Sequence, residues 1–330
     1  MKVLTNFAIY NGCLDEYGTM SELAKDCSEA GIDGIEAIWD WTPYEGEMPL
    51  QKMSPGYHLT FWSCWVDYWL HDEDALMREF GTWDMVHEYY HGYDRQSIID
   101  TYIEDMKHAM EVDAEYLVFH VSEVNLEEVF THEFLHSDEL VADCAVELAN
   151  IITPYITNGA AFLIENLWWP GFTFTRPEIT KRILDGIEYE NKGIVLDIGH
   201  LMNSNPELRS QADGVRYIND MLDEHGDLSK QIRALHLHQS VSGDYVRSTG
   251  YKLSQEFLDA PGFWEKYTVS YNHLLKVDRH EPWTDPSIVQ VIDRISPEWI
   301  NNELSAYGRK AHLDALKTQM DTLRRGGFEG

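Results

Sequence analysis

The sequence has few cysteines for its length, and it lacks any long hydrophobic run. Its 330 residues include only four cysteines, none of them in a Cys-x-x-Cys pair: Cys13, Cys27, Cys64 and Cys144. So sparse a set does not form the disulfide framework of a small secreted domain. No apolar run approaches the roughly eighteen residues of a membrane-spanning helix, and the first residues show no charged region followed by a long apolar stretch. We therefore expect a soluble cytoplasmic protein with reduced thiols and no membrane partner.

Basic residues are also scarce. The chain has 25 Lys and Arg against 57 Asp and Glu, which gives a formal net charge of -32 at pH 7. A charge of this sign repels polyanions at long range, although net charge alone does not exclude a local basic patch. We expect no nucleic-acid partner.

The chain has no Pro/Ser-rich linker, no low-complexity segment and no internal repeat beyond an alternation of strand-like and helix-like segments. Apolar strand-like runs lie at about residues 3–10, 32–38, 58–66, 116–121, 162–166, 194–198, 232–238 and 299–304. Helical periodicity covers about 21–30, 98–110, 138–157, 177–186, 211–224, 287–295 and 310–324.

This alternation predicts one (β/α)8 TIM barrel over residues 1–330 rather than a doubly wound sheet. A hydrophobic content of 44% is enough for a large core. We expect two long loop insertions at the rim, at about 67–96 and 239–282, and a C-terminal helix at about 310–324.

Several predicted strands end in an ionisable side chain. The clearest is the run from Gly193 to His200, in which apolar residues lead to Asp197 and then to His200. One interpretation is that Asp197 only caps the next helix while His200 lies in solvent, because capping is a common use of Asp after a strand. Repetition favours a site instead, since three further runs end at Glu165, His236 and Glu303.

In a (β/α)8 barrel the carboxyl ends of all strands converge on one face, so these side chains would meet in one pocket. Three carboxylates without a cation would repel one another and raise their pKa values. Carboxylate and imidazole ligands suit Mn²⁺, Mg²⁺, Co²⁺ or Zn²⁺. The sequence therefore predicts one divalent metal bound by Glu165, Asp197, His236 and Glu303.

These motifs resemble the xylose isomerase-like TIM barrels, which comprise sugar isomerases and epimerases and the AP endonuclease relatives. The resemblance spans nearly the whole chain and rests on Ile164-Glu-Asn166, Asp197-x-x-His200, Leu235-His-Leu-His238 and Glu303. It implies the same four metal ligands, with His200 on the substrate or on a further metal. His238 is an alternative to His236, because it follows on the same strand face two residues later.

Two further motifs resemble the AP endonuclease branch: Phe119-His120 and Val277-Asp-Arg-His280. The resemblance implies that His120, Asp278 and His280 complete a multinuclear zinc site. The alternative is that the Asp-x-His loop is solvated and that His120 binds only a hydroxyl. We find no counterpart of the branch's histidine on the third strand, where Phe61 or Trp62 stands, and Glu281–Pro286 replaces its Gly-rich sequence.

The resemblance favours a metal-dependent sugar isomerase or epimerase that works through an enediolate. Glu165 and Glu303 would exchange the proton, and His200 would polarise a substrate oxygen. Other substrate contacts would come from His120, His238, Trp168, Asp278 and His280. Trp169, Trp62 and Trp65 could also face the sugar, although Trp62 could equally pack between barrel and helix.

Three alternatives stay open beside this function. The same chemistry serves a lyase, such as a C-glycoside-cleaving relative. Clustered zinc would instead make an AP endonuclease-like phosphodiesterase, which the acidic, aromatic rim insertions oppose because DNA binding needs Lys and Arg. A non-catalytic sugar-binding barrel would have lost ligands, and none of the four is lost. The expected partner is a small carbohydrate, and a homo-oligomer is one possibility.

Overall fold

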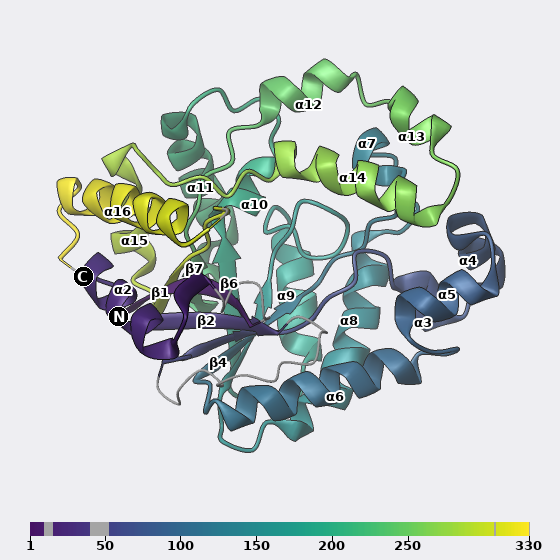
Figure 1. The fold of residues 1–330 in the computed structure, drawn as a ribbon, viewed down its shortest axis with the longest axis horizontal. Helices are drawn as coiled ribbons and strands as arrows, with labels where there is room; N and C mark the ends of the chain where they lie inside the picture. The colour runs from purple at the N-terminus through teal and green to yellow at the C-terminus, as the bar shows by residue number, and fades with distance from the viewer. Residues whose placement is uncertain (10–15, 40–52, 307, 330) are drawn as a thin grey trace.

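A computed structural model describes residues 1–9, 16–39, 53–306 and 308–329. Eight parallel strands form a closed barrel in chain order, with the last strand paired to the first. This confirms the predicted (β/α)8 fold (Figure 1). The strands are β1 (Lys2–Ile9), β2 (Gly34–Trp39), β3 (Gly56–His58), β4 (Tyr116–His120), β5 (Ala161–Glu165), β6 (Lys192–Asp197), β7 (Ile232–His236) and β8 (Trp299–Asn302).

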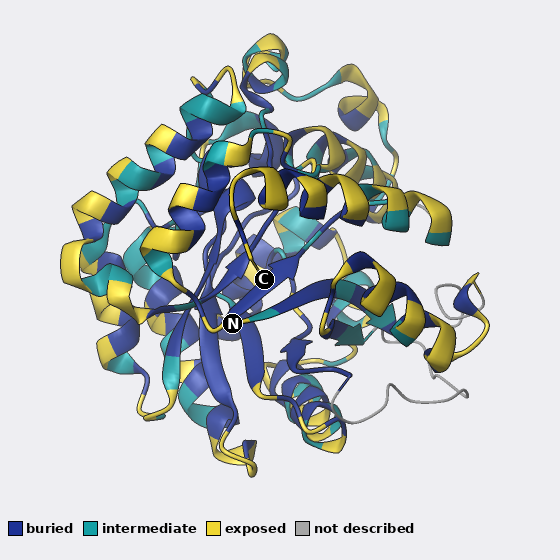
Figure 2. Ribbon diagram, turned by 90° about the vertical axis from the view of Figure 1, so that its left-hand side faces the viewer, coloured by how far each residue is buried: buried dark blue, intermediate teal, exposed yellow. Residues whose placement is uncertain are grey.

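The strands are largely apolar because one face fills the barrel and the other receives the helices. Every residue of β5 is buried, and its Leu163 joins Val195 and Ala234 in a small cluster separate from the main core. The neighbouring Phe162 and Ile164 belong to the main core under the helices. Figure 2 shows the buried central strands in dark blue and the exposed outer faces of the helices in yellow.

The longer helices begin and end where local signals predict. Thr19 caps the amino terminus of α2 by accepting from Glu22 N, and Gly31 closes it with a φ of 81°. The helix predicted at 138–157 ends earlier, at Ile152, because Pro154 supports only a short 3₁₀ turn. The helices around the barrel are α2 (Met20–Ala30), α6 (Gln96–Glu111), α8 (Asp138–Ile152), α9 (Pro177–Gly186), α10 (Ile198–Asn203), α11 (Gln211–His225), α15 (Val289–Ile295) and α16 (Arg309–Arg325), with 3₁₀ turns η1 (Thr153–Tyr155), η2 (Gly226–Gln231) and η3 (Pro286–Ile288).

The two insertions expected as loops are largely helical. Residues 67–96 contain most of three short helices, two of which are capped by Asp72 and Thr82. The sequence did not reveal them because helices this short span too few turns to show a clear helical periodicity. The second insertion ends in a longer helix, α14, at the rim of the barrel (Figure 1). The insertion helices are α3 (Val66–Leu70), α4 (Glu73–Phe80), α5 (Trp83–Tyr90), α7 (Glu128–Thr131) after β4, α12 (Gly243–Thr249), α13 (Gln255–Asp259) and α14 (Phe263–Val277).

Most predicted strand boundaries differ from the structure by one or two residues, and the third strand differs most. The third strand, predicted at 58–66, covers only Gly56–His58 and therefore ends where we expected it to begin. The seventh ends at His236 and the eighth at Asn302, each two residues early. Tyr10, the predicted end of the first strand, lies outside the described residues. Within the described ranges, no helix is long and apolar enough to cross a membrane.

Candidate metal centre and adjoining pocket

Four side chains from consecutive strand ends meet on the carboxyl-terminal face of the barrel. Glu165 ends β5, Asp197 ends β6 and His236 ends β7, while Glu303 directly follows β8. His236 Nδ1 lies 3.0 Å from Glu165 Oε1, 2.7 Å from Glu303 Oε2 and 3.6 Å from Asp197 Oδ2. One ligand atom from each of the four lies within 4.8 Å of the others. The structure thus brings together all four predicted metal ligands.

Glu165 and Asp197 are buried and Glu303 is partly buried, and the pKa of each carboxyl lies below its usual value. Burial alone would raise the pKa of Glu165, but the charges of His236 and His120 outweigh it and hold the pKa well below its usual value. The pKa of Glu303 is lowered in the same way, with burial offset by His236 and His280. A buried set of carboxylate oxygens and imidazole nitrogens fits a divalent cation of the Mg²⁺ to Zn²⁺ series. The residues present therefore fit the metal that the sequence predicts.

Two further clusters adjoin the first and share ligands with it. Glu165 Oε2 lies 3.2 Å from His58 Nε2 and 3.1 Å from His120 Nε2, which makes a second possible cation position. The third possible position is formed by Asp197, His200, His238 and His280. The Nδ1 atoms of His120 and His238 are buried without a hydrogen-bond partner in the described structure.

His58 corrects our expectation that the third strand lacks a histidine. From the apolar pattern we predicted a third strand that begins at His58. That prediction placed Phe61 or Trp62, rather than a histidine, where relatives of the AP endonuclease branch have a metal ligand. In the structure His58 is instead the last residue of β3 and points to Glu165. Burial lowers its pKa, but the hydrogen bond and charge of Glu165 outweigh this and raise the pKa to about 9.

Of the two histidines on the seventh strand, His236 belongs to the first cluster. Its Nε2 lies 3.1 Å from Glu36 Oε1, so a buried carboxylate orients the ring while Nδ1 faces the cluster. Glu36 also accepts from Tyr116 OH at 2.6 Å and from Asn301 Nδ2 at 2.8 Å. Sequence reasoning missed Glu36, although a carboxylate inside the apolar run Gly34–Trp39 was a signal for it.

His238 lies just past β7 and faces the third cluster. Its Nε2 is 2.9 Å from Asp197 Oδ2, and its ring stacks on His280 with centroids 3.9 Å apart. Gly199 leaves room for this ring, because a Cβ at position 199 would lie 2.0 Å from His238 Cε1. His238 is not among the described residues that line the pocket below, so its predicted substrate contact stays a prediction.

Asp197 has two roles, one for each oxygen. Oδ1 accepts from His200 N at 2.6 Å and caps α10, as the simpler interpretation expected. Oδ2 faces His238 and the clusters. His200 is buried rather than solvated, because its Nδ1 lies 3.0 Å from Asn166 O and its Nε2 lies 3.3 Å from Asp278 Oδ2.

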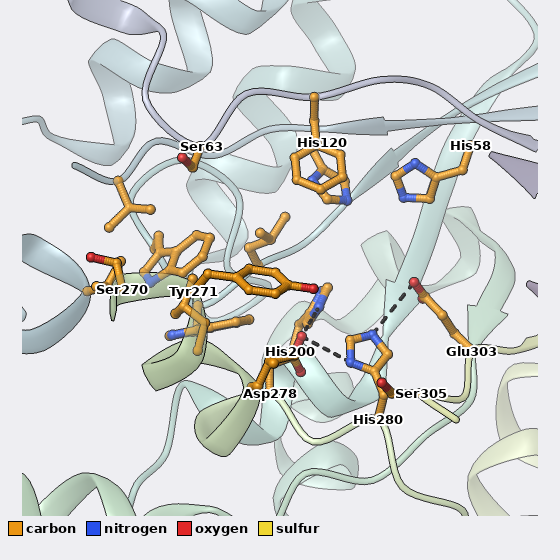
Figure 3. A pocket seen from close by; sticks show the side chains of 18 of the residues that line it. His58, Ser63, His120, His200, Ser270, Tyr271, Asp278, His280, Glu303 and Ser305 are labelled. Atoms are coloured by element: carbon orange, nitrogen blue, oxygen red, sulfur yellow. Dashed lines mark hydrogen bonds and ion pairs between the residues drawn. The ribbon is translucent and has the colours of Figure 1, made fainter. Parts of the chain in front are cut away.

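A cavity of about 390 Å³ opens beside the clusters (Figure 3). Its wall includes His58, His120, His200, Asp278, His280 and Glu303. Asp278 Oδ2 lies 3.1 Å from His280 Nδ1, and His280 Nε2 lies 3.6 Å from Glu303 Oε1, so the Asp-x-His segment is packed into the site rather than solvated. Glu165, Asp197 and His236 lie behind this wall and do not line it in the described structure.

The predicted aromatic contacts divide into two groups. Trp168 and Trp169 line the cavity, and their ring centroids are 4.4 Å apart. Trp62 packs near Tyr102 at 5.8 Å, which confirms the packing interpretation for this residue. Trp65 is buried and donates from Nε1 to Ser122 O at 2.8 Å. Trp168 and Trp169 are thus the tryptophans of this set that can contact a ligand.

The protein is thus a (β/α)8 barrel with a cluster of carboxylates and histidines that is suited to bind a divalent metal. The chain belongs to the xylose isomerase-like TIM barrel family, a family of metal-dependent enzymes, whose sequence profile matches residues 24–293. No curated protein matches the chain significantly.

Solved structures share the fold at low identity. Endonuclease IV from Thermus thermophilus is 11% identical, with a TM-score of 0.53 over 98% of this chain and 100% of that one. A D-tagatose 3-epimerase-like protein is 13% identical, with a TM-score of 0.52 over 99% and 98%. D-allulose 3-epimerase from Methylomonas sp. is 8% identical, with a TM-score of 0.53 over 99% and 98%. At these identities the likeness shows the fold alone.

Proposed function

We propose that this protein is a divalent-metal-dependent isomerase or epimerase of a small sugar or sugar derivative. The observation that carries the proposal is the position of Glu303. This carboxylate belongs to the first cluster and also lines the cavity, so a substrate held at the cluster would reach it.

The proposed chemistry is removal and return of a proton on the carbon next to a carbonyl. A bound divalent cation would supply polarisation of adjacent carbonyl and hydroxyl oxygens. In an isomerisation, Glu303 accepts the proton at its carboxylate and returns it to the neighbouring carbon, while His280 keeps the carboxylate oriented. An epimerisation also needs a proton donor on the opposite face of the enediolate, which is the role predicted for Glu165. His200, which also lines the cavity, donates a hydrogen bond to a substrate oxygen as the enediolate forms.

The role that we propose for Glu165 differs from the proton transfer that the sequence suggested. Its side chain is fully buried among His58, His120 and His236, and it does not line the cavity in the described structure. We therefore propose Glu165 chiefly as a metal ligand. Direct proton transfer by Glu165 stays a prediction, because the side chains that separate Glu165 from the cavity would have to move for a substrate to reach it.

The test combines metal analysis with isotope exchange. We expect protein purified without chelators to contain a divalent metal, and accepted sugars to take up solvent deuterium at the α carbon in D₂O. Glu303→Gln, compared at saturating metal, should lose exchange by a factor on the order of 10² or more. The matched control is Glu133→Gln, an exposed carboxylate. Full exchange in Glu303→Gln would refute the assignment.

A lyase, such as a C-glycoside-cleaving enzyme, would use the same proton transfer and then expel a β-substituent. Product analysis separates the two activities, because an isomerase or epimerase conserves the formula of its substrate and a lyase splits it. Retained exchange with two products would therefore shift the proposal to the lyase.

A zinc phosphodiesterase of the AP endonuclease type is the second candidate. It is favoured by one observation, the three adjoining clusters that include His58 on the third strand. The net charge of -32 opposes binding of duplex DNA. We expect marginal, nonproductive binding of an abasic duplex at physiological salt; strand cleavage that His280→Ala abolishes would establish this second candidate.

A further inference from the structure

The cavity beside the clusters has two chemically different halves. One half carries the histidines and carboxylates of the centre. The other is walled mainly by aliphatic side chains from the segment after β4 and from α14, with a few hydroxyl groups among them: Val124, Leu126, Val129, Leu274 and Leu275, and Ser63, Tyr267, Ser270 and Tyr271. In Figure 3, His58 and Glu303 lie on one side of the cavity, Ser63 and Ser270 lie on the other, and Tyr271 lies between them.

A free sugar does not match both halves. Its hydroxyls surround the ring, and those facing Val124 or Leu126 would lose water without gaining a partner. Ser270 donates its proton to Leu126 O at 3.2 Å, so it can only accept from a ligand hydroxyl. An apolar substituent on the sugar would instead gain from the same contacts.

The aliphatic half also suits an uncharged group. Apart from two tyrosines, the ionisable side chains of the described wall are four histidines, Asp278 and Glu303. The histidines and Glu303 belong to the clusters, and Asp278 lies within 3.3 Å of His200 and His280. A phosphate at the aliphatic end would meet no guanidinium or ammonium group from the described residues, and a buried anion without such a partner is costly.

Trp169 lines the cavity and carries a polar atom that is unpaired among the described residues. It is 6% exposed, and its indole Nε1 is buried without a hydrogen-bond partner in the described structure. A buried indole N–H needs an acceptor, and a hydroxyl, carbonyl or ether oxygen of a ligand would provide one.

We propose that the substrate is an unphosphorylated sugar that keeps a carbonyl group and carries an uncharged aromatic or apolar substituent, as in an aryl glycoside with a carbonyl on another ring carbon. The substituent lies between residues 124–129 and α14, while the carbohydrate end lies at the metal-type clusters. This inference rests on the proposed function for the placement of the carbohydrate end. The cavity of about 390 Å³ falls within the range of roughly 300–1,000 Å³ typical of pockets for drug-sized ligands.

The test is calorimetric binding to the metal-loaded protein. Phenyl glycosides are compared with methyl glycosides of the same sugars and with the corresponding sugar phosphates. Burial of a phenyl ring should tighten binding on the order of tenfold or more relative to methyl, and sugar phosphates should bind no tighter than free sugars. Equal affinity for phenyl and methyl glycosides, tighter binding of phosphates, or no binding of any glycoside would overturn the inference.

Two variants locate the binding site of the substituent. Leu274→Asn should reduce the phenyl-to-methyl affinity ratio severalfold, and Val129→Thr, which keeps the side-chain shape, should reduce it less. Leu258→Asn, at an exposed position in α13, should leave the ratio unchanged. An unchanged ratio in both pocket variants would overturn the placement.

Isotope exchange separates this inference from the proposed function. Phenyl selectivity without α-proton exchange in a phenyl-substituted sugar that keeps its carbonyl would leave the substrate class standing and refute the isomerase proposal. Exchange with free sugars and no preference for phenyl over methyl would support the isomerase proposal and refute the inferred substrate class.

Discussion

At Gly199, one added carbon atom would displace a histidine of the third cluster. In Gly199→Ala the new Cβ would lie 2.0 Å from His238 Cε1 and 2.3 Å from Nδ1, so the ring must leave its stack on His280. Because the third cluster depends on this ring, we expect lower metal occupancy and a loss of about 1–3 kcal/mol in the free energy of unfolding.

Metal titration and denaturant unfolding of Gly199→Ala check this prediction. The control is Gly262→Ala, where the nearest atoms belong to the flexible Glu265 side chain. Equal stability and equal metal content in wild type and Gly199→Ala would contradict it.

Glu36 acts through His236 rather than on a ligand. Its carboxylate lies 3.1 Å from His236 Nε2 and is held by Tyr116 and Asn301. Glu36→Gln keeps the shape but removes the charge that orients the imidazole, so metal affinity should fall roughly 10–100-fold while the fold remains. Competition with a chelating dye measures this affinity. Glu115→Gln, near Lys2 and Trp299, is the control; an affinity equal to wild type would leave Glu36 with a packing role only.

At the scale of elements, hydrogen bonds join α14 to the segment after β4, and both line the pocket. Ser270 Oγ donates to Leu126 O at 3.2 Å, and His273 Nε2 lies 3.1 Å from Val129 O. Ser270→Ala would leave a buried carbonyl without this partner, at a cost of about 1–3 kcal/mol. We expect faster amide hydrogen exchange in α14 and weaker ligand binding. Thr268→Ala, whose hydroxyl bonds only within the helix, should change neither; identical exchange in both variants would show that the bond does not hold α14.

The sequence predicted the strands better than their ends, and it missed the helices of the insertions. The alternation of apolar runs identified all eight strands, and the ligands that end β5, β6 and β7 were found because their runs are local patterns. The end of β3 is set by three pairs with β2, from Glu36 with Gly56 to Ile38 with His58, which no local pattern reveals. His58 was missed for this reason. Glu36 was missed because its strand is otherwise apolar and the partner that explains it is 200 residues away.

At the scale of the whole molecule, four consecutive strands carry buried charges where they end or just beyond. Ions bound only by the folded state stabilise it, by about 2.7 kcal/mol at a hundredfold excess over Kd. EDTA should therefore lower the melting temperature by on the order of 5 °C. Scanning calorimetry with EDTA, and again after excess Mn²⁺ or Zn²⁺, measures the shift. Asp197→Asn should respond less than wild type, and an unchanged wild-type melting temperature would count against bound metal.

The sharing of ligands among the three clusters bears on how such a centre can change over generations. Glu165 belongs to two clusters and Asp197 to two, whereas His58, His120, His200, His238 and His280 each belong to one. Loss of an outlying histidine removes a single position and spares the rest, but loss of Glu165 or Asp197 damages two positions at once. The five outlying histidines are thus the residues at which a single mutation could remove or restore one cation position, whereas a mutation of a shared carboxylate would affect two.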